Sequence, residues 1–411
     1  MIIGVDASCW ANQRGYGRYT RELLTALFDA DQRNEYRLFI DTESAKQAVD
    51  LPEGIPQVRV NTSKAATQAA SAAGRRSLRD IWAMRQAVNR YGSDLDVFYF
   101  PSVYTYFPVK TRAKVIVTIH DTTAERYPKL IFPNRLSRLF WNLKVQMAVR
   151  RADLIATVSE ASKIEIVREF GVAAEQVRVV SDAVGPEFYR LNPDARTPDA
   201  RTPDARSREV LAKYGVNIGL PFILYVGGIS PHKNLITLVR AHAALQRVAG
   251  GVKTNLVLLG DYQKDVFYSS YPDLCREIEQ LGTKDWVVFT GFVDDADLVH
   301  FYNGASTLVM PSFDEGFGLP ALEAMACGTP VIASRAGALP EVVGDVGKLF
   351  NPHDPDELKV CLSAVLGDAK LHQEMSRQGL QRAKEFSWAR SANSALAVFE
   401  EVASSLEPVT A

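Results

Sequence analysis

The sequence predicts an α/β protein with two doubly wound, Rossmann-like domains. Short apolar runs alternate along the chain with amphipathic stretches of helical length, a pattern typical of parallel sheets covered by helices on both faces. The length of 411 residues exceeds the size at which a single hydrophobic core stops growing. The apolar runs also fall into two sets, which a polar, proline-punctuated tract separates.

The apolar runs predict a strand in each of the following places. In the first half they lie at residues 2–5, 36–40, 58–61, 97–100, 115–119, 154–158 and 177–180. In the second half they lie at 222–226, 255–259, 287–290, 307–310, 331–333 and 347–349. Because ligands of such sheets bind at the carboxyl ends of the strands, we expect the functional residues in the loops that follow them. The loop after the first strand contains Arg14–Tyr19 and is expected to lead into a helix from about Tyr19 to Phe28.

A short repeat suggests where one domain ends and the next begins. Three copies of a five-residue unit start at Pro193, two reading P-D-A-R-T and the last ending in Ser207, within an expected junction at residues 186–210. This charged tract has few apolar residues to bury, so a flexible loop is expected. The N-terminal domain is expected at 1–185, the C-terminal domain at 211–387 and a terminal helix over 388–411.

The net charge of −1 hides an uneven distribution. Residues 1–185 contain 26 Lys/Arg and 20 Asp/Glu, whereas residues 186–411 contain 21 and 28. Two expected helices of the first half, at 70–91 and 134–151, are rich in Arg and also carry large apolar residues. Such helices either lie on an anionic membrane surface or cover a domain core. No zinc-finger, helix-turn-helix or RRM pattern supports a nucleic-acid partner.

The cysteine pattern and the first residues suggest a cytoplasmic protein. If the basic helices bind lipid, the protein would lie at the inner face of the cytoplasmic membrane. The four cysteines are far apart and form no C-x-x-C pair, which is typical of reduced thiols. The first residues form a short apolar strand rather than a basic leader with a long apolar core, so no signal peptide is expected.

The most informative segment runs from Asp314 to Pro330 and reads D-E-G-F-G-L-P-A-L-E-A-M-A-C-G-T-P. Pro320 suits the first turn of a helix, and Gly328 suits a left-handed stop. The segment therefore predicts a loop, about two helical turns and then a buried strand.

Two glutamates flank the expected helix start. Backbone N–H groups from Gly318 to Ala321 would point out of this start and favour an anion. Glu315 precedes it, and Glu323 lies one turn inside the helix. A sugar nucleotide, whose anionic leaving group lies between hydroxyl-bearing rings, fits this layout. A capped crossover with an incidental acidic pair would give the same pattern.

Together with three other segments, this run resembles the signature of family 4 glycosyltransferases, which are retaining enzymes of the GT-B fold. The other segments are R-G-Y-G-R-Y at Arg14–Tyr19, T-I-H-D at Thr118–Asp121 and Y-V-G-G-I-S-P-H-K-N-L at Tyr225–Leu235. The resemblance covers nearly the whole chain. It implies two Rossmann-like domains that face across a cleft, with the acceptor on the N-terminal side and the donor on the C-terminal side. The terminal helix would cross back to the N-terminal domain.

The resemblance also implies roles for individual residues. The catalytic candidates are His120 beside the transferred sugar, Lys233 at the departing phosphate and Glu315 at a ring hydroxyl of the sugar. His232 stands where an Arg usually precedes the Lys, and Arg14 stands where the first glycine of its loop usually lies. The donor-binding candidates are Gly15, Gly17, Gly227, Gly228, His232, Lys233, Phe292, Val293, Glu315, Phe317, Gly318, Leu319 and Glu323, the last of which would bind the ribose.

No metal or other cofactor is expected, because Lys233, backbone dipoles and a helix start supply positive charge. The sequence Asp94-Leu95-Asp96 has the D-x-D form of metal-dependent transferases. It precedes an expected strand, away from the carboxyl edge, and we interpret it as a solvated loop.

The expected activity is retaining transfer of a hexose from a GDP- or UDP-linked donor, with mannose as a candidate. The expected acceptor is a glycan or lipid-linked glycan in polysaccharide or glycoconjugate biosynthesis. Two alternatives remain open at this point. One is a sugar-nucleotide epimerase of the same architecture, and the other is a non-catalytic protein that binds nucleotide sugars.

Overall fold

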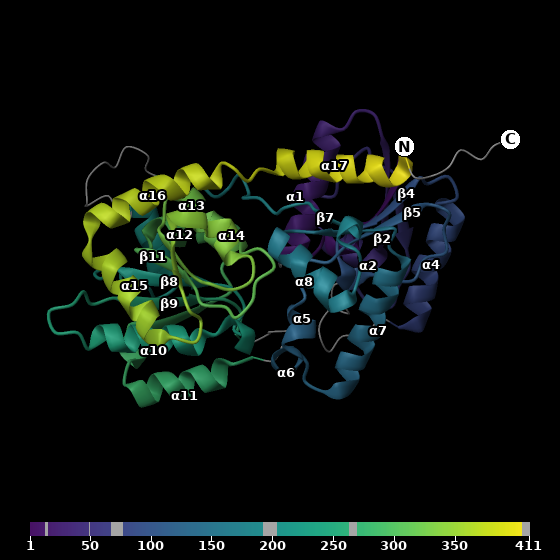
Figure 1. Cartoon of the computed structure of the whole chain (residues 1–411). Helices are drawn as coiled ribbons and strands as arrows, with labels where there is room; N and C mark the ends of the chain where they lie inside the picture. The colour runs from purple at the N-terminus through teal and green to yellow at the C-terminus, as the bar shows by residue number, and fades with distance from the viewer. Residues whose placement is uncertain (13–14, 49, 67–76, 192–203, 263–268, 405–411) are drawn as a thin grey trace. The chain divides into compact units, whose positions relative to one another are not determined.

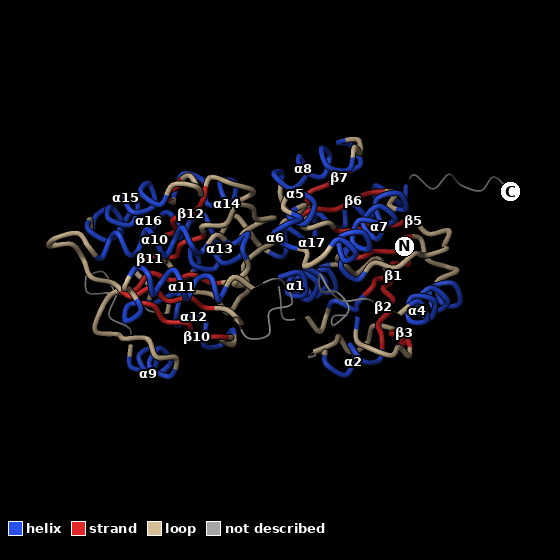
Figure 2. The backbone as a smooth tube through the Cα atoms, turned by 90° about the horizontal axis from the view of Figure 1, so that it is seen from below, coloured by secondary structure: helices blue, strands red, loops and turns tan. Residues whose placement is uncertain are grey.

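The computed structural model of the chain describes all residues except 13–14, 49, 67–76, 192–203, 263–268 and 405–411 (Figure 1). The chain forms two compact units, Met1–Asp182 together with Ser387–Ala411, and Ala183–Phe386. Each unit contains one parallel sheet, and helices surround the strands of each sheet (Figure 2). The expected α/β fold of two Rossmann-like domains is confirmed.

The first unit contains a seven-stranded sheet in the order β3-β2-β1-β4-β5-β6-β7. Every pairing in it is parallel. Its strands are β1 (Ile2–Asp6), β2 (Glu35–Asp41), β3 (Gln57–Val60), β4 (Val97–Phe100), β5 (Lys114–Thr118), β6 (Leu154–Thr157) and β7 (Val177–Val179).

The second unit contains a six-stranded parallel sheet in the order β10-β9-β8-β11-β12-β13. Its strands are β8 (Phe222–Val226), β9 (Asn255–Leu259), β10 (Val287–Gly291), β11 (Thr307–Met310), β12 (Val331–Ser334) and β13 (Lys348–Phe350). In both sheets each strand lies within one residue, at either end, of the range expected from the sequence.

The helices of the first unit are α1 (Gly15–Ala30), α2 (Thr42–Gln47), α4 (Leu78–Tyr91), α5 (Thr123–Arg126), α6 (Pro128–Ile131), α7 (Arg135–Arg151), α8 (Glu160–Phe170) and α17 (Trp388–Ser404). Those of the second unit are α9 (Ala205–Lys213), α10 (Leu235–Gln246), α11 (Tyr271–Leu281), α12 (Asp295–Gly304), α13 (Leu319–Ala326), α14 (Leu339–Val343), α15 (Pro355–Gly367) and α16 (Ala369–Ala383). No helix among the described residues is long and apolar enough to cross a membrane.

Side-chain caps fix where several helices begin. The Asn134 side chain accepts a hydrogen bond from Ser137 N at the start of α7, and Ser159 accepts one from Ser162 N at the start of α8. These bonds satisfy N–H groups that have no partner inside a helix. The last repeat unit serves the same purpose, because Asp204 accepts a hydrogen bond from Ser207 N and Ala205 opens α9. The flexible loop expected up to residue 206 is therefore wrong for this end of the repeat, and its first part lies outside the described residues.

The terminal helix α17 belongs to the first unit, as the family resemblance implied. It packs along α1, and the ring of Phe399 lies 5.2 Å from that of Tyr99 on β4. Trp388, Ala392 and Phe399 are buried. The core of the first unit thus includes residues from both ends of the chain.

The strand order reverses direction once in each sheet. In the first sheet β1 lies between β2 and β4, and in the second β8 lies between β9 and β11. At each reversal the chain leaves the two neighbouring strands toward opposite faces of the sheet. The two strands are β1 and β4 in the first sheet and β8 and β11 in the second. A crevice opens at their carboxyl ends. The motifs that follow β1, β8 and β11 are therefore placed where ligands of such sheets bind.

Two backbone segments approach each other closely at the carboxyl edge of the second sheet. A Cβ built on Gly260, which follows β9, would lie 1.9 Å from the carbonyl oxygen of Gly227, which follows β8. The contact leaves no room for a side chain. Backbone hydrogen bonds fix it further, from Gly227 N to Leu259 O (3.0 Å) and from Gly260 N to Gly291 O (3.1 Å).

We expect Gly260→Ala to lower the free energy of unfolding by about 1–3 kcal/mol, as is typical when a methyl group is forced into a packed site. Urea unfolding followed by circular dichroism measures the change. Gly367→Ala is the matched control, because a Cβ there meets no atom within 4 Å and alanine favours a helix. Equal stability of Gly260→Ala and the wild type would show that the turn has room to move.

Candidate functional site

A pair of opposite charges lies at the carboxyl edge of the second sheet. Lys233 Nζ is 2.8 Å from Glu315 Oε1 and 2.9 Å from Oε2. The Ser312 hydroxyl donates a further hydrogen bond of 2.6 Å to Oε1. The two charged side chains are 20% and 12% exposed, so solvent screens them weakly while part of each still reaches the surface.

The position of Lys233 depends on Asn234, which sequence reasoning missed. Asn234 adopts a left-handed conformation with φ of 55°, a conformation that Asn tolerates better than most residues. Its side-chain amide donates to the carbonyl oxygens of Pro311 (2.9 Å) and Pro352 (2.7 Å). The turn after β8 is thereby tied to the loop after β11. An Asn between a glycine turn and a helical stretch was the signal that could have revealed it.

The position of Glu315 depends on a second missed residue, Gly337. A Cβ at Gly337 would lie 2.6 Å from both the backbone N and O of Glu315. The same approach allows Ala338 N to donate a hydrogen bond of 2.9 Å to Glu315 O. Glycine is therefore required at residue 337 for the loop after β12 to pack on the glutamate.

His232 is held beside the pair and is uncharged at neutral pH. Its backbone oxygen accepts a hydrogen bond from Phe313 N (2.9 Å), and its Nδ1 lies 3.2 Å from Ser230 Oγ. Burial, and then the positive charge of Lys233, hold the pKa of His232 well below its ordinary value. In place of the usual Arg, the chain thus provides a neutral ring here.

Glu323 lies in the middle of α13 and is 2% exposed. The Tyr302 hydroxyl donates a hydrogen bond of 2.6 Å to its Oε2. Burial, followed by the charge of Glu323, raises the pKa of the nearby Cys327 thiol. Tyr302 was not expected to take part, because 21 residues separate it from its partner. The ribose contact of Glu323 stays a prediction.

The start of α13 differs in one respect from the expectation. Gly318 has φ of 107°, and a Cβ on it would lie 2.7 Å from Leu339 Cδ2. However, Ala321 N donates to Gly318 O at 2.9 Å, so the expected set of outward N–H groups does not extend to Ala321. Since Pro320 has no N–H, the N–H groups that open the helix are those of Gly318 and Leu319.

The other expected donor residues of the second unit lie in three places. The backbone of Gly227 and Gly228 forms the turn after β8, where the Tyr225 hydroxyl donates to Gly228 O at 2.7 Å. After β10, Phe292 is 55% exposed while Val293 is buried. The Phe317 side chain is buried too, and its ring lies 5.6 Å from that of Phe386.

In the first unit, Gly15 and Gly17 lie inside a helix rather than in a loop before it. The sequence predicted a helix from about Tyr19, but α1 begins at Gly15. Gly17 is required for packing, since a Cβ there would lie 2.0 Å from Asn12 O. Arg14 lies outside the described residues.

His120 follows β5 and presents a neutral ring with a defined proton position. Its Nε2 lies 3.1 Å from the Pro101 carbonyl oxygen. Because a carbonyl can only accept, Nε2 carries the proton and Nδ1 carries a lone pair. Burial lowers the pKa of His120 to about 4, against the opposing effect of Asp121. As the pH falls from 6.5 toward 4, the unfolded chain takes up this proton more readily, so the fold loses stability in that range.

The D-x-D carboxylates have structural partners. Asp94 forms two hydrogen bonds with Arg37, of 2.7 and 3.0 Å, and Asp96 Oδ2 accepts one from Ile2 N at 2.8 Å. Within the described part of the chain, no group of three or more His, Cys, Asp or Glu side chains is arranged to hold a metal ion.

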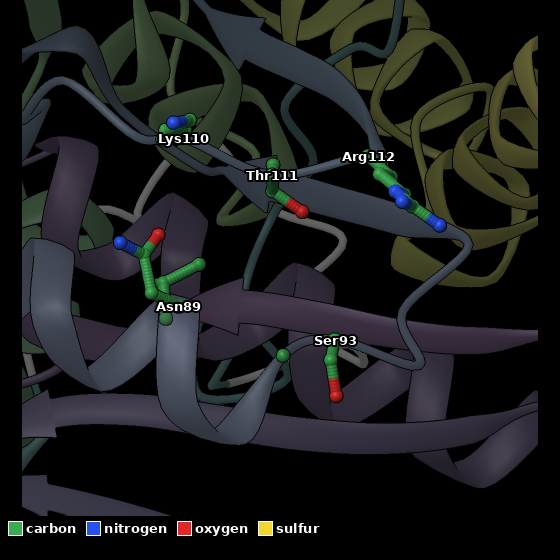
Figure 3. Close-up of a pocket in the computed structure, with 7 residues that line it drawn as sticks. Asn89, Ser93, Lys110, Thr111 and Arg112 are labelled. Atoms are coloured by element: carbon green, nitrogen blue, oxygen red, sulfur yellow. The ribbon is translucent and has the colours of Figure 1, made fainter.

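A surface pocket lies at the opposite edge of the first sheet, where the strands begin (Figure 3). It is lined by Val88, Asn89, Gly92, Ser93, Lys110, Thr111 and Arg112. These residues end α4 or precede β4 and β5. None of the candidate residues lies in this pocket, and ligands of open parallel sheets bind at the other edge.

Two family descriptions match the chain. "Glycosyltransferase Family 4" matches residues 14–188, and "Glycosyl transferases group 1" matches residues 207–382. The chain is a family 4 glycosyltransferase. These matches cover both units of the enzyme.

Relatives and solved structures agree with this assignment. The glycosyltransferase is 29% identical to the O-antigen chain mannosyltransferase B of Escherichia coli over 91% of its own length and 92% of that protein. It is 32% identical to the D-inositol 3-phosphate glycosyltransferase of Saccharomonospora viridis over 62% of the chain and 57% of the relative. Its fold matches a sucrose-phosphate synthase from Thermosynechococcus elongatus with a TM-score of 0.73 at 19% identity, over 98% of both chains.

We expect variants of the glycosyltransferase to separate nucleotide binding from turnover. If Lys233 and Glu315 have the roles that the resemblance implies, Lys233→Ala and Glu315→Ala should lower turnover about 100- to 1,000-fold, because their groups would then act where charge develops. Glu323→Ala should instead weaken nucleotide affinity about tenfold or more, as loss of a charged hydrogen bond does. His120→Ala should lower turnover and spare affinity.

Calorimetry with the nucleoside diphosphate and single-turnover rates measure the two effects. Glu277→Gln is the control, because Glu277 forms an ion pair with the more exposed Arg240 on the helical surface of the same unit. Near wild-type rates for both His120→Ala and Glu315→Ala would disprove these roles.

Proposed function

We propose that the enzyme transfers mannose from a nucleoside-diphosphate mannose to a glycan acceptor during the synthesis of an O-antigen-type polysaccharide. The observation that carries this proposal is the match to an O-antigen chain mannosyltransferase over 91% of the chain. Other relatives are also mannosyltransferases, although the chain spans 30% of their length. The named relatives are transferases, so they lend no support to an epimerase or to a non-catalytic protein.

The chemistry that we assign to the site is retaining. The bond between the sugar C1 and the phosphate oxygen breaks, and a bond from C1 to the acceptor oxygen forms on the same face. The acceptor proton passes to the departing phosphate oxygen, so no side chain forms a covalent intermediate. Family resemblance supports this sequence of events.

Lys233 and Glu315 would act together in this step. The Lys233 ammonium would neutralise charge on the departing phosphate, a contribution that is large where water is excluded. Glu315 would accept a hydrogen bond from a sugar hydroxyl, and its ion pair with Lys233 (2.8 Å) keeps both groups in place before the donor binds. His120 Nδ1, which has no hydrogen-bond partner in the described part of the chain, is available to the same sugar.

We further propose that no metal takes part. A permanent cation on a short 3-10 turn, Pro231–Lys233, and the N–H groups at the start of α13 provide positive charge. In transferases that use a metal, a divalent ion performs this task instead. The proposal therefore makes Lys233 the functional substitute for the ion.

Donor turnover with GDP-mannose, UDP-glucose and UDP-galactose tests both proposals. We expect release of nucleotide from a mannose-linked donor, at rates within about twofold in 5 mM EDTA and in Mg²⁺, because the charge comes from the chain. The anomeric configuration of the product, read by NMR, should match that of the donor. Turnover of the UDP-linked sugars alone would overturn the mannose assignment, and loss of activity in EDTA that Mn²⁺ restores would overturn metal independence.

The outer face of α7 supports a peripheral contact with an anionic membrane. Five large apolar side chains on this helix are between 36% and 62% exposed: Leu136, Leu139, Phe140, Leu143 and Met147. Their spacing places them along one side of the helix, and Arg135, Arg138 and Arg150 are exposed on the same helix. Exposed apolar residues with basic neighbours are the pattern of helices that lie in the interface of an acidic bilayer.

We expect the enzyme to bind vesicles that contain 30% phosphatidylglycerol and to lose this binding as salt rises, because screening weakens each contact. Leu139→Ser/Leu143→Ser and Arg135→Glu/Arg138→Glu should each reduce binding about tenfold or more. Val360→Ser, which removes an apolar side chain that is 63% exposed in the second unit, should have no effect. Equal binding to neutral vesicles, or none to either kind, would leave α7 as ordinary domain surface.

A further inference from the structure

A serine at the start of α8 is bonded to the residue that the resemblance places beside the transferred sugar. Ser162 lies in the first turn of this helix and is 5% exposed. Its hydroxyl donates a hydrogen bond of 3.0 Å to the backbone carbonyl of His120, which lies 42 residues earlier in the chain. Ser162 was not among the residues that the sequence predicted for the site, although it contacts one of them directly.

This bond lies where the pairing of β5 with β6 ends. Thr118 of β5 is opposite Ala156 of β6, and Ile119 N donates to Ala156 O at 2.9 Å. His120 is the next residue and follows the paired part of the strand. Since Ser162 comes from the helix that follows β6, its side chain continues the connection that the backbone makes one residue earlier.

The cap of α8 in turn fixes the backbone of Ser162. Ser159 is the N-cap of the helix, and its Oγ accepts a hydrogen bond of 3.0 Å from Ser162 N. Such a cap stabilises the first turn, because it satisfies an N–H group that has no partner within the helix. The hydroxyl that reaches His120 O therefore starts from a defined backbone position.

Two further elements hold the imidazole of His120. Its Nε2 donates a hydrogen bond of 3.1 Å to the carbonyl of Pro101, which directly follows β4. The ring of Tyr19 on α1 meets the imidazole edge-on, with a centroid distance of 4.8 Å and an interplanar angle of 89°. A ring bond alone lets a residue pivot about one contact, whereas the bond from Ser162 holds the main chain of His120 as well.

We propose that Ser162 is a positioning residue for the transfer reaction. Its hydroxyl fixes the main chain of His120, and through it the imidazole, so that Nδ1 is presented to the donor sugar in one orientation. A group that is held in place before the substrate binds contributes more to the rate than one that must first be ordered. The proposal rests on the proposed function in one respect, namely that His120 contacts the transferred sugar.

Turnover and nucleotide affinity of the whole enzyme test the proposal, with the nucleotide sugar that the wild type turns over fastest. Ser162→Ala should lower kcat about tenfold, as loss of one partner of a buried hydrogen bond does. Its affinity for the nucleoside diphosphate should stay within about twofold of the wild type, because only the step that involves the sugar is affected.

Two other substitutions separate the hydrogen bond from the packing of the side chain. Ser162→Thr keeps a hydroxyl donor and should keep kcat within about threefold of the wild type. Ser162→Cys keeps a similar volume but has only a weak donor, so it should lose activity like Ser162→Ala and replaces that variant if alanine prevents folding.

Ser44→Ala is the matched control in the same unit. Ser44 is a buried serine in the first turn of α2, and its N–H is capped by Asp41 as that of Ser162 is capped by Ser159. Its hydroxyl has no hydrogen-bond partner in the described part of the chain. Loss of this hydroxyl should therefore change kcat less than about twofold.

A double-mutant cycle shows whether Ser162 acts through the imidazole. In the His120→Ala background, Ser162→Ala should change kcat less than about twofold, because the ring that the serine positions is absent. An undiminished tenfold loss in this background would overturn the proposal. Wild-type turnover by His120→Ala would overturn the role of His120 on which the proposal rests.

Side-chain ¹⁵N NMR of histidine-labelled enzyme gives a second measurement that needs no donor. The His120 signals are those missing from His120→Ala, and in the wild type they should report a proton on Nε2. In Ser162→Ala they should move toward the average of the two tautomers, because the bond to Pro101 O loosens. Unchanged His120 signals in Ser162→Ala would overturn the proposal. Failure to turn over a mannose-linked donor would overturn only the proposed function, because this measurement uses no nucleotide sugar.

Discussion

The site of the second unit depends on one topological constraint, the reversal of strand order at β8 and β11. The chain leaves these neighbouring strands toward opposite faces of the sheet, so the loops after them meet at the edge without a helix between them. Lys233 comes from one loop and Glu315 from the other, 82 residues apart in sequence. The ion pair is costly to desolvate, and it is held by Asn234, Ser312 and the close approach of Gly337. The left-handed conformation of Asn234 and the absence of a side chain at Gly337 thus serve to hold these two side chains together.

The first unit repeats the topology with a different chemistry. Its own reversal, at β1 and β4, brings together the rings of Tyr16 and Tyr104, the neutral imidazole of His120 and the carboxyl of Glu125, whose pKa burial raises to about 7. The second unit presents a permanent cation and a carboxylate instead. Aromatic rings provide large apolar faces, whereas an ammonium group attracts negative charge. The same backbone plan thus provides two surfaces that differ in polarity, and the difference lies in a few side chains at the carboxyl ends of the strands.

The sequence was sufficient for the strands because buried parallel strands are continuous apolar runs, such as Phe222–Val226. Glu315 and Lys233 could also be singled out from the sequence, since their motifs are local, and the structure places them in contact. The contacts that position the site residues could not be predicted. Asn234, next to Lys233, reaches Pro352 across 118 residues, and Tyr302 reaches Glu323 from another helix. The start of α1 was placed too late, because glycines signal loops, whereas Gly17 serves the close packing of a helix on Asn12. Contacts of this kind depend on how distant segments pack against each other. The periodicity of a sequence predicts helices and strands but not this packing.

The return of α17 to the first unit has a consequence for the order of events during synthesis on the ribosome. Residues 183–386 form a continuous unit, which can close its core as soon as it has emerged. The first unit begins to be made earlier, but it lacks the buried residues Trp388, Ala392 and Phe399 until the whole second unit has been synthesised. It must therefore wait with part of its apolar surface uncovered, a state in which nascent chains recruit chaperones and aggregate. A nonsense codon at Ser387, directly after the second unit, would leave that unit able to fold and the first permanently incomplete.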